Sequence, residues 1–435
     1  MKIERIEAFQ IYDSRGNPTV ECAVTLENGA VGAGLVPSGA STGRNEAFEL
    51  RDGEPHRLRG NSVYTAIDNI ESVIAPRLLG ADVFAQADID RDLCELDGTA
   101  NKSRLGANAI LAVSMAIADA AAAARQVPLF EYLGDGLGNV LPLPQIQLFG
   151  GGAHSAWRTD VQDFLIIPLG ASNYPHALEM THNVYHAAGE WMRKRNKYCG
   201  VADEGGYWPE FENHGQVLDA IIECIELAGY TPGRDMAIAL DIAAGELYEG
   251  TSYRFNLENK SFDTEALLKL LLDWCSNYPV ISLEDPFSDR DWAGWEALYG
   301  ELGSSIQLIG DDLFTTNPEL IKRGVERRQA NAVLIKPNQI GTVSETLAAI
   351  RCTQQAGWRP VVSARSGETE DVFISHLAVA TNAGQIKVGS FARGERMAKW
   401  NELLRIERCL RDDATFLGKQ VFEPLQGMRF LPKIR

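Results

Sequence analysis

The sequence predicts an α/β protein in which a closed (β/α)8-type barrel follows a smaller N-terminal α+β domain. Three observations support this fold class. The 435 residues exceed what one small core can organise. The first third places strand-like segments before helical ones, and the remainder alternates short apolar runs with amphipathic segments. A hydrophobic content of 45% and a charged content of 23% are ordinary for a folded globular chain.

The first third is expected to hold a small sheet followed by helices. Strands are predicted at 6–11, 19–26 and 30–36, because the turn-forming stretches SRGNP and ENG separate them. A helical pattern follows over 63–123. Its alanine-rich part, 105–118, is uncharged but too short to cross a bilayer, which favours a tightly packed helix. The glycine-rich stretch 134–144 then marks a junction, so we expect domains at 1–135 and 136–435.

The second domain is expected to contain a parallel sheet with helices outside it. Its near-continuous apolar runs are FLIIPLG, MAIALD, VISLED, IQLIGD, NAVLIK, RPVVSA and QIKVG. Seven or eight such units in roughly 300 residues fit a closed barrel, which typically takes about 250 residues. An open doubly wound sheet is the alternative, but no G-x-G-x-x-G follows a first strand.

Charge and cysteine usage narrow the class of partner. The 41 basic residues against 59 acidic ones give a net charge of −18, which argues against nucleic acid as a main partner. Seven scattered cysteines without a C-x-x-C pair fit a reducing compartment. The first residues carry no continuous apolar segment of the signal-peptide kind. We therefore expect a cytoplasmic protein that binds neither nucleic acid nor membrane.

Charged residues stand where successive apolar runs end. In chain order they are Asp241, Glu284–Asp285, Asp311–Asp312, Lys336, Arg365–Ser366 and Lys387. In a barrel the carboxyl ends of the strands open on one face, where the active site forms. A single charged residue at a strand end usually marks only where the chain becomes exposed to solvent. Here acidic residues end the earlier strands and basic residues the later ones, which predicts an acidic arc facing a basic arc.

The two arcs together predict carbon-acid chemistry. Three carboxylates with water suit Mg²⁺, and no histidine or cysteine joins them to favour zinc. Arg365 and Lys387 are expected to bind an anion. The positive charges of Lys387, Arg365 and a divalent cation are expected to lower the pKa of Lys336, which would make it a proton acceptor. The inferred reaction is removal of the α-proton of a carboxylate substrate, with the metal holding the enolate.

The chain resembles the enolase family along essentially its whole length. The matching stretches are DSRGNPTVE, PSGASTG, EAFELRDG, LDGTANKSRLGANAILAVS, DEGGY, LIKPNQIGT, RSGETED and AGQIKVGS. The resemblance implies an N-terminal α+β domain, a C-terminal barrel and a homodimer or larger symmetric homo-oligomer. It also implies dehydration of 2-phosphoglycerate, a small anionic phosphorylated carboxylate, to phosphoenolpyruvate with two Mg²⁺ per active site.

The same resemblance assigns roles to individual positions. It implies that the first metal is bound by Asp241, Glu284 and Asp311, and that Ser41 in the mobile PSGASTG loop reaches the second. Lys336 would take the C2 proton, and Glu204 in DEGGY would be the general acid that assists loss of the C3 hydroxyl. The substrate-binding positions would be His154, Gln162, Asp163, Arg365, Ser366 and Lys387, with Lys387 at the carboxylate and Arg365 and Ser366 at the phosphoryl group.

Several departures from the family pattern fall in these site motifs. The family's S-H-R-S-G-E-T-E-D motif has Ala364 in place of the histidine, Asp163 replaces a glutamate, Trp208 follows DEGGY, and the 151–158 loop ends in Arg158. Three explanations remain open. The protein is a working enolase with reduced activity, or a non-catalytic relative kept for binding. The third is an enzyme for a larger phosphonylated substrate, such as carboxyphosphonoenolpyruvate synthase, with volume opened at Ala364 and charge added by Arg158.

Overall fold

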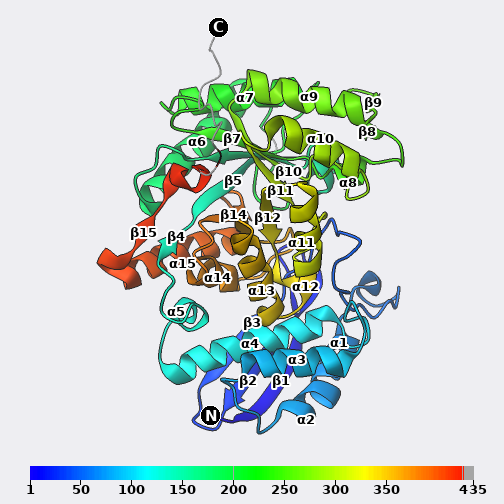
Figure 1. Ribbon diagram of the computed structural model, residues 1–435, viewed down its shortest axis with the longest axis vertical. Helices are drawn as coiled ribbons and strands as arrows, with labels where there is room; N and C mark the ends of the chain where they lie inside the picture. The colour runs from blue at the N-terminus through cyan, green and yellow to red at the C-terminus, as the bar shows by residue number, and fades with distance from the viewer. Residues whose placement is uncertain (199, 424, 426–435) are drawn as a thin grey trace.

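The N-terminal part is a three-stranded antiparallel sheet, seen in the computed structural model that describes residues 1–198, 200–423 and 425 (Figure 1). Its order is β1 (Ile3–Tyr12), β2 (Pro18–Leu26) and β3 (Val31–Leu35). The three strands predicted from the sequence are confirmed, with ends moved by at most three residues. The turns Ser14–Asn17 and Glu27–Ala30 separate them, because glycines at positive φ reverse the chain there.

Helices follow the sheet, as the sequence predicts. They are α1 (Tyr64–Asn69), the π-helical turn η2 (Ile70–Ile74), α2 (Ala75–Leu78), α3 (Gln86–Asp97), α4 (Ala107–Arg125) and α5 (Leu129–Leu133). Helix α4 packs on β2 and β3. A Cβ on Gly32 would lie 2.0 Å from the backbone N of Ala120, so only glycine allows this approach. Among the described residues α4 has the length and hydropathy of a membrane span, but 83% of that window is buried inside the protein.

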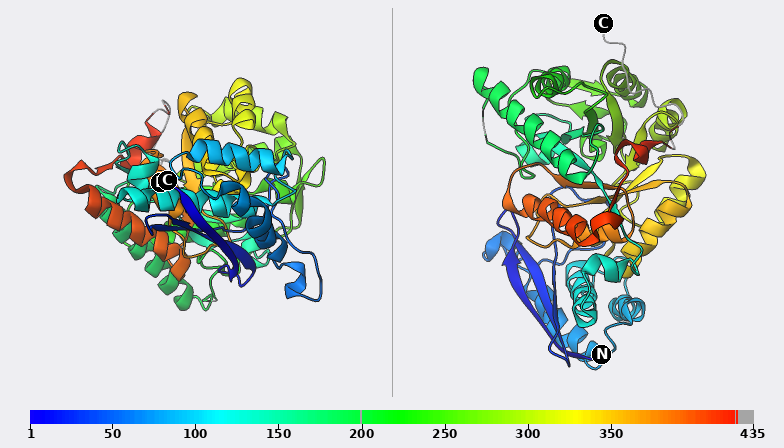
Figure 2. Two further views of the ribbon diagram at one scale, coloured as in Figure 1. Left: turned by 90° about the horizontal axis from the view of Figure 1, so that it is seen from below. Right: turned by 90° about the vertical axis from the view of Figure 1, so that its left-hand side faces the viewer.

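A closed eight-stranded barrel forms the larger part (Figures 1 and 2). Its order around the ring is β10 (Val280–Glu284), β11 (Gln307–Gly310), β12 (Ala332–Ile335), β13 (Arg359–Ser363), β14 (Gln385–Gly389), β5 (Leu143–Gly150), β6 (Asp163–Ile167) and β7 (Ala237–Asp241). The predicted barrel is confirmed, and the open-sheet alternative is excluded.

One strand departs from the expected parallel arrangement. β6 runs antiparallel to both β5 and β7, whereas every other neighbouring pair in the barrel is parallel. The prediction of an all-parallel sheet is therefore wrong at β6. A short loop joins β5 directly to β6 with only the 3-10 turn η3 (Gly152–Ser155) between them, and no crossover helix is present to keep the two strands parallel.

Helices follow the barrel strands, and the longer ones cover the outside of the barrel. They are α6 (Tyr174–Lys194), α7 (His214–Leu227), α8 (Ala244–Leu247), α9 (Thr264–Asn277), α10 (Trp292–Leu302), α11 (Pro318–Arg327), α12 (Pro337–Ile340), α13 (Val343–Gln355), α14 (Phe373–Ala380) and α15 (Gly394–Leu410). The strand pairs β8 (Tyr253–Phe255) with β9 (Lys260–Phe262), and β4 (Val140–Leu141) with β15 (Thr415–Phe416), lie outside the barrel, as do the 3-10 turns η1 (Leu58–Gly60), η4 (Arg411–Asp413) and η5 (Gly418–Phe422).

The N-terminal part closes over the mouth of the barrel. Residues 36–43 follow β3 and run along the loop after β13: the backbone N of Ser38 donates to the carbonyl of Gly367 at 2.8 Å, and the N of Gly367 donates back at 2.9 Å. We call this segment the lid. It places Ala40 and Ser41 on the same cavity as side chains from the barrel strands. The expected division at 135/136 stays a prediction.

Candidate active site

One cavity at the barrel mouth brings the predicted site residues together. Its lining is Ala40, Ser41, His154, Gln162, Asp163, Glu204, Asp241, Lys336, Ser363, Ala364, Arg365, Ser366 and Lys387. The two remaining predicted residues, Glu284 and Asp311, lie directly behind this lining and are bonded to Lys387 and Lys336. The strand ends therefore deliver their charges to one place, as expected for a barrel.

The reversed strand β6 explains how Asp163 reaches this mouth. Asp163 is the first residue of β6, so in a parallel barrel it would lie at the far end. Because β6 is antiparallel, Asp163 pairs in register with Asp241, the last residue of β7. The preceding Gln162 donates its amide to Asp241 at 3.0 Å. The correction to the fold thus places this pair of predicted residues in the site.

Lys387 connects three carboxylates from three strands. Its ammonium lies 2.8 Å from Asp241, 2.8 Å from Glu284 and 3.2 Å from Asp163, and all four side chains are buried. Burial alone would lower the pKa of Lys387, but the three carboxylates raise it well above its ordinary value. For Glu284, burial and the charge of Asp241 raise the pKa well above the usual range. Lys387 is therefore a fixed positive charge.

Lys336 does not show the pKa expected from the sequence. Its Nζ lies 2.5 Å from Oδ2 of Asp311, and both side chains are buried. Burial lowers the pKa of Lys336, but Asp311 outweighs burial and raises it. Burial likewise raises the pKa of Asp311, and Lys336 outweighs it to give a value below normal. In this arrangement the nearest charge to the amine is a carboxylate, so the lowered pKa expected beside a bound divalent cation stays a prediction.

The acidic side of the site fits a hard divalent cation. Asp241, Glu284 and Asp311 offer only carboxylate oxygens, and Oε1 of Glu284 is buried without a hydrogen-bond partner. A second acidic group lies beside them, since ligand atoms of Asp285, Asp311 and Asp312 fall within 4.8 Å of one another. Burial and mutual repulsion raise the pKa of Asp285 well above normal. Concentrated negative charge on oxygen donors suits Mg²⁺.

Glu204 lines the same cavity, close to a histidine and another carboxylate. His154 Nδ1 is 3.5 Å from Asp163 and 4.0 Å from Glu204. Burial, and next the charge of Asp163, raise the pKa of Glu204. A carboxyl group with a raised pKa can hold the proton that a general acid must give.

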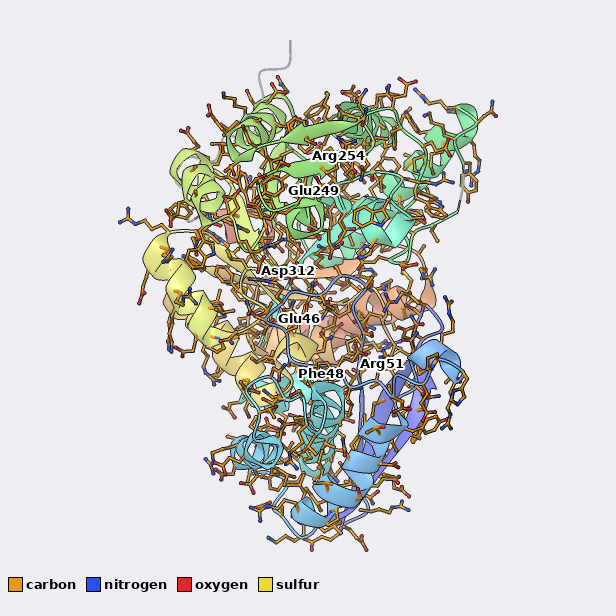
Figure 3. All side chains as sticks on the ribbon, turned by 90° about the vertical axis from the view of Figure 1, so that its right-hand side faces the viewer. Glu46, Phe48, Arg51, Glu249, Arg254 and Asp312 are labelled. Carbon is orange, nitrogen blue, oxygen red and sulfur yellow. The ribbon has the colours of Figure 1, made fainter. Side chains whose placement is uncertain are left out.

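The lid engages the predicted phosphoryl-side residues. Ser366 Oγ accepts the backbone N of Ala40 at 2.7 Å, and Arg365 donates to the carbonyl of Ser41 at 2.9 Å. Arg365 also donates to both carboxylate oxygens of Glu46. Glu46 lies just after the lid and is labelled in Figure 3. The sequence motifs contain Glu46, but no role was predicted for it.

A buried amide links the lid side to the acidic side. Gln339 Nε2 donates to Asp311 Oδ1 at 2.8 Å and to Glu46 Oε1 at 3.3 Å, and its Oε1 accepts the hydroxyl of Thr316 at 2.8 Å. Gln339 is fully buried. Its place in LIKPNQIGT, three residues after Lys336 in a four-residue helix, was the available signal. No role was predicted for it.

The two departures expected to reshape the phosphoryl pocket differ in position. Ala364 lines the cavity and is 6% exposed, so an alanine in place of a histidine changes the wall of the pocket, as expected. Arg158 does not line it. Its guanidinium lies 4.8 Å from the ring centroid of Trp208 and 3.5 Å from Glu210. The expectation that Arg158 adds charge to the pocket is therefore wrong, because Trp208 and Glu210 hold it outside.

This fold and site define a class: barrel enzymes in which a lysine faces a cluster of carboxylates beneath an N-terminal lid. Residues 3–133 match the family described as enolase, N-terminal domain, and residues 138–425 match enolase, C-terminal TIM barrel domain. Over 424 residues the chain is 54% identical to Enolase 1 of Desulfitobacterium hafniense (strain Y51), covering 97% of each. The chain belongs to the enolase family, and it is an enolase-type hydro-lyase.

Proposed function

We propose that this protein dehydrates 2-phosphoglycerate to phosphoenolpyruvate and uses two Mg²⁺ per active site. The observation that carries the proposal is the single cavity on which Lys336 and Glu204 both open, with the carboxylates of Asp241, Glu284 and Asp311 at its acidic side. A base and an acid on one cavity are what a β-elimination needs. The 54% identity to a protein named Enolase 1 supports the same substrate.

The proposed roles follow from charge and position. Asp241, Glu284 and Asp311 would hold the first Mg²⁺, and Ser41 of the lid would contribute to the second. Bound there, magnesium would stabilise negative charge on the substrate carboxylate and lower the pKa of Lys336. Lys336 accepts the C2 proton. Glu204 donates its proton to the departing C3 hydroxyl, so water leaves and the double bond forms.

The remaining side chains would bind and orient the substrate. Lys387, kept positive by three carboxylates, would pair with the substrate carboxylate. Arg365 and Ser366 would hold the phosphoryl group once it replaces their present lid contacts. His154, Gln162 and Asp163 complete the wall near Glu204. Such fixed partners hold the C2 hydrogen toward the base and keep bulk water out.

A second candidate is the same elimination on a substrate with a larger phosphonylated group. Ala364 is the observation that favours it, because an alanine takes the place of an imidazole on the wall beside Arg365. The product would then be an enolpyruvate ester of the kind that carboxyphosphonoenolpyruvate synthase makes, in a pathway to a phosphinate antibiotic. Because Arg158 lies outside the pocket, this candidate rests on the space opened at Ala364 and not on an added positive charge.

One experiment separates the candidates. The protein is incubated with Mg²⁺ and 2-phosphoglycerate in D₂O, and both C2 exchange and enolpyruvate formation are followed. Fast turnover supports the first candidate. Exchange with slow turnover supports the second, and then Ala364→His should raise turnover on 2-phosphoglycerate. Absence of both exchange and turnover would refute both candidates.

The assembly and cellular location belong to this proposal as well. We infer a homodimer or larger symmetric homo-oligomer. Phe9 and Tyr12 are 47% and 55% exposed on β1, an edge strand, which supports association of copies there. A domain boundary at 135/136, a role in glycolysis and a cytoplasmic location remain predictions of the same kind.

A further inference from the structure

A second cavity lies on the outside of the barrel, behind the end of the lid. Its volume is about 220 Å³, and it is enclosed by Arg44 and Asn45 after the lid, by Trp292 at the start of α10 and by residues of α11. Leu313, Phe314 and Leu320 supply apolar surface. None of its lining residues lines the catalytic cavity. A volume somewhat above the ~150 Å³ that accepts benzene would hold one aromatic ring with a small substituent.

The polar part of this outer cavity is basic. Arg44, Arg323 and Arg327 line it, and Asp289 is its one acidic residue, bonded to Arg44 at 3.0 Å. No hydrogen bond or ion pair of Arg323 occurs within the described part of the chain, where its guanidinium lies 5.5 Å from the ring centroid of Trp292. The cavity therefore carries a net positive charge in a chain whose total is −18.

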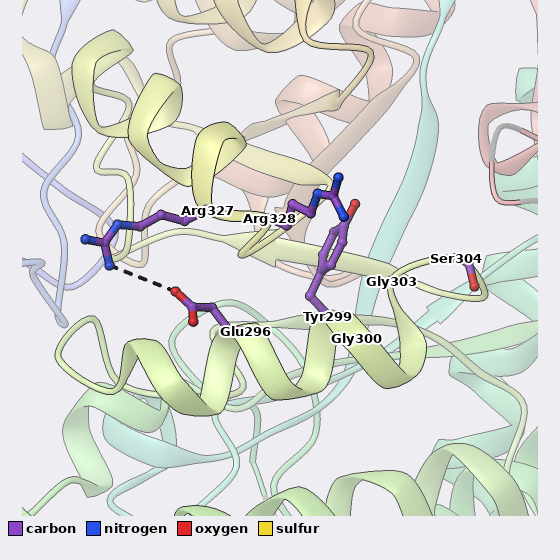
Figure 4. A pocket seen from close by; sticks show the side chains of 7 residues that line it. All are labelled: Glu296, Tyr299, Gly300, Gly303, Ser304, Arg327 and Arg328. Atoms are coloured by element: carbon purple, nitrogen blue, oxygen red, sulfur yellow. Dashed lines mark ion pairs between the residues drawn. The ribbon is translucent and has the colours of Figure 1, made fainter.

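Arg327 is shared with a neighbouring groove between α10 and α11. Its guanidinium lies 4.2 Å from the Trp292 ring centroid and makes a long ion pair of 3.9 Å with Glu296. Figure 4 shows this ion pair, with Arg328 beside Tyr299 on the other side of the groove. Arg328 lines the groove but not the outer cavity. Arg327 can therefore contact a ligand in the outer cavity, whereas Arg328 faces only the groove.

A buried, unpartnered donor also belongs to the outer cavity. Gln329 lines it and is 4% exposed, yet its Nε2 has no hydrogen-bond partner. A buried amide donor without a partner lowers stability, so such groups usually face a ligand, an ion or water. An acceptor in the cavity would satisfy this donor.

We propose that the outer cavity binds a small organic anion that carries a phosphate, sulfonate or carboxylate on a flat apolar body. The apolar body packs against Trp292, Leu313 and Leu320, and the anionic group takes donors from Arg323, Arg44 and Gln329. Each feature of the cavity finds a partner in such a ligand, whereas inorganic phosphate alone would leave the aromatic and aliphatic surface uncovered.

An occupant would also act on the lid. Arg44 directly follows Gly43, where a Cβ would lie only 2.7 Å from Thr315 Cγ2 and 3.0 Å from Asp312 Oδ1. This close packing joins the end of the lid to the turn after Asp311. A ligand bridging Arg44 and Arg323 would fasten the lid to α11 and favour its docked arrangement.

The test uses phenyl phosphate, with the full-length protein in isothermal titration calorimetry. We expect saturable binding of phenyl phosphate and at least roughly tenfold weaker binding of inorganic phosphate, since the ring buries apolar surface. Arg323→Gln should weaken phenyl phosphate about tenfold through loss of a charged donor. Arg328→Gln is the matched control, with the same charge change outside the cavity, and should bind like the wild type.

Gln329→Met provides a second variant that separates binding from folding. It should weaken phenyl phosphate without lowering the free energy of unfolding in urea, because Nε2 has no partner to lose. Three results would each overturn the proposal: no saturable binding of phenyl phosphate, equal affinity in wild type and Arg323→Gln, or equal affinity for phenyl phosphate and inorganic phosphate. Equal affinity in wild type and Arg323→Gln would point to binding at the catalytic cavity.

Discussion

Glu46 holds Arg365 with both of its carboxylate oxygens, Oε2 at 2.9 Å from Nη1 and Oε1 at 3.2 Å from Nη2. Arg365 also donates to Asn338 at 3.1 Å and to the carbonyl of Ser41 at 2.9 Å. Both terminal nitrogens of the guanidinium are therefore engaged by protein oxygens. An anion that binds Arg365 in a bidentate fashion must replace some of these contacts. Anion binding at Arg365 and docking of the lid are therefore coupled.

The first prediction concerns this ion pair. Glu46→Gln removes the charge while keeping the size, and the lid should open more often, because a broken buried ion pair costs about 3–5 kcal/mol and 1.4 kcal/mol is already tenfold. We expect cleavage within residues 36–43 by a protease in limited digestion to be at least about tenfold faster. Glu54→Gln, at an exposed site, is the control and should digest like the wild type. Equal cleavage rates in Glu46→Gln and wild type would show that the ion pair between Glu46 and Arg365 does not hold the lid in place.

The second prediction concerns the buried amide of Gln339. Gln339→Leu leaves Asp311 Oδ1 without a partner and removes the acceptor that lies 2.8 Å from the Thr316 hydroxyl, so we expect a loss of about 2–3 kcal/mol in the free energy of unfolding in urea. Gln339→Glu should cost more, because it places a third carboxylate between Asp311 and Glu46. Gln354→Leu, on the surface, is the control. The idea fails if Gln339→Leu is as stable as the control.

The third prediction assigns the two proton transfers of the proposed reaction to separate residues. Lys336→Met should abolish C2 exchange of 2-phosphoglycerate in D₂O, whereas Glu204→Gln should retain exchange and lose dehydration. The expected loss in each case is about 10²–10⁴-fold, the usual contribution of a general acid or base. Circular dichroism checks that both variants fold. Retained exchange in Lys336→Met would remove it from the role of base.

The fourth prediction concerns the pH dependence of stability that Asp371 causes. Its carboxylate accepts the backbone N–H of Leu35 at the end of β3, and it is not one of the acidic residues that end the barrel strands. Burial raises the pKa of Asp371 to about 6, even though the backbone N–H groups of Phe373 and Leu35 oppose the shift. A carboxyl whose folded-state pKa exceeds its unfolded value stabilises the protein at low pH, and this stabilisation is lost as pH rises from about 4 through about 6.

Asp371→Asn should remove this dependence. The difference in free energy of unfolding, variant minus wild type, should rise by about 2 kcal/mol between pH 4 and pH 8. Urea denaturation at fixed ionic strength measures it, and the exposed Asp68→Asn serves as a control with the same chemical change. A difference that stays constant across this range would show that Asp371 has an ordinary pKa.

The sequence predicted most of the fold because the elements have strong local patterns. The turn residues between β1, β2 and β3 and the apolar runs of the barrel strands are readable without any knowledge of distant contacts. The reversal of β6 was missed, since an apolar run carries no sign of its direction. It follows from the short β5–β6 connection, which periodicity alone did not distinguish from a crossover.

The candidate site was predictable to the extent that its residues end strands. Asp241, Glu284 and Lys336 were found in this way, because a barrel presents all such ends together. Glu46 and Gln339 lie in a connecting segment and a single helical turn, where a polar residue is unremarkable. Their importance comes from partners more than 25 residues away in the chain.

Strand patterning and motif order are properties of neighbouring residues, so they reveal which charges stand at the barrel mouth and which family the chain resembles. The pairing of those charges, in contrast, follows from the folded arrangement. Lys387 lies among three carboxylates, Lys336 pairs with Asp311, and Arg158 is held outside the pocket by Glu210. Electrostatic energy depends on distances of a few ångströms between residues that folding brings together, and a linear sequence does not contain those distances.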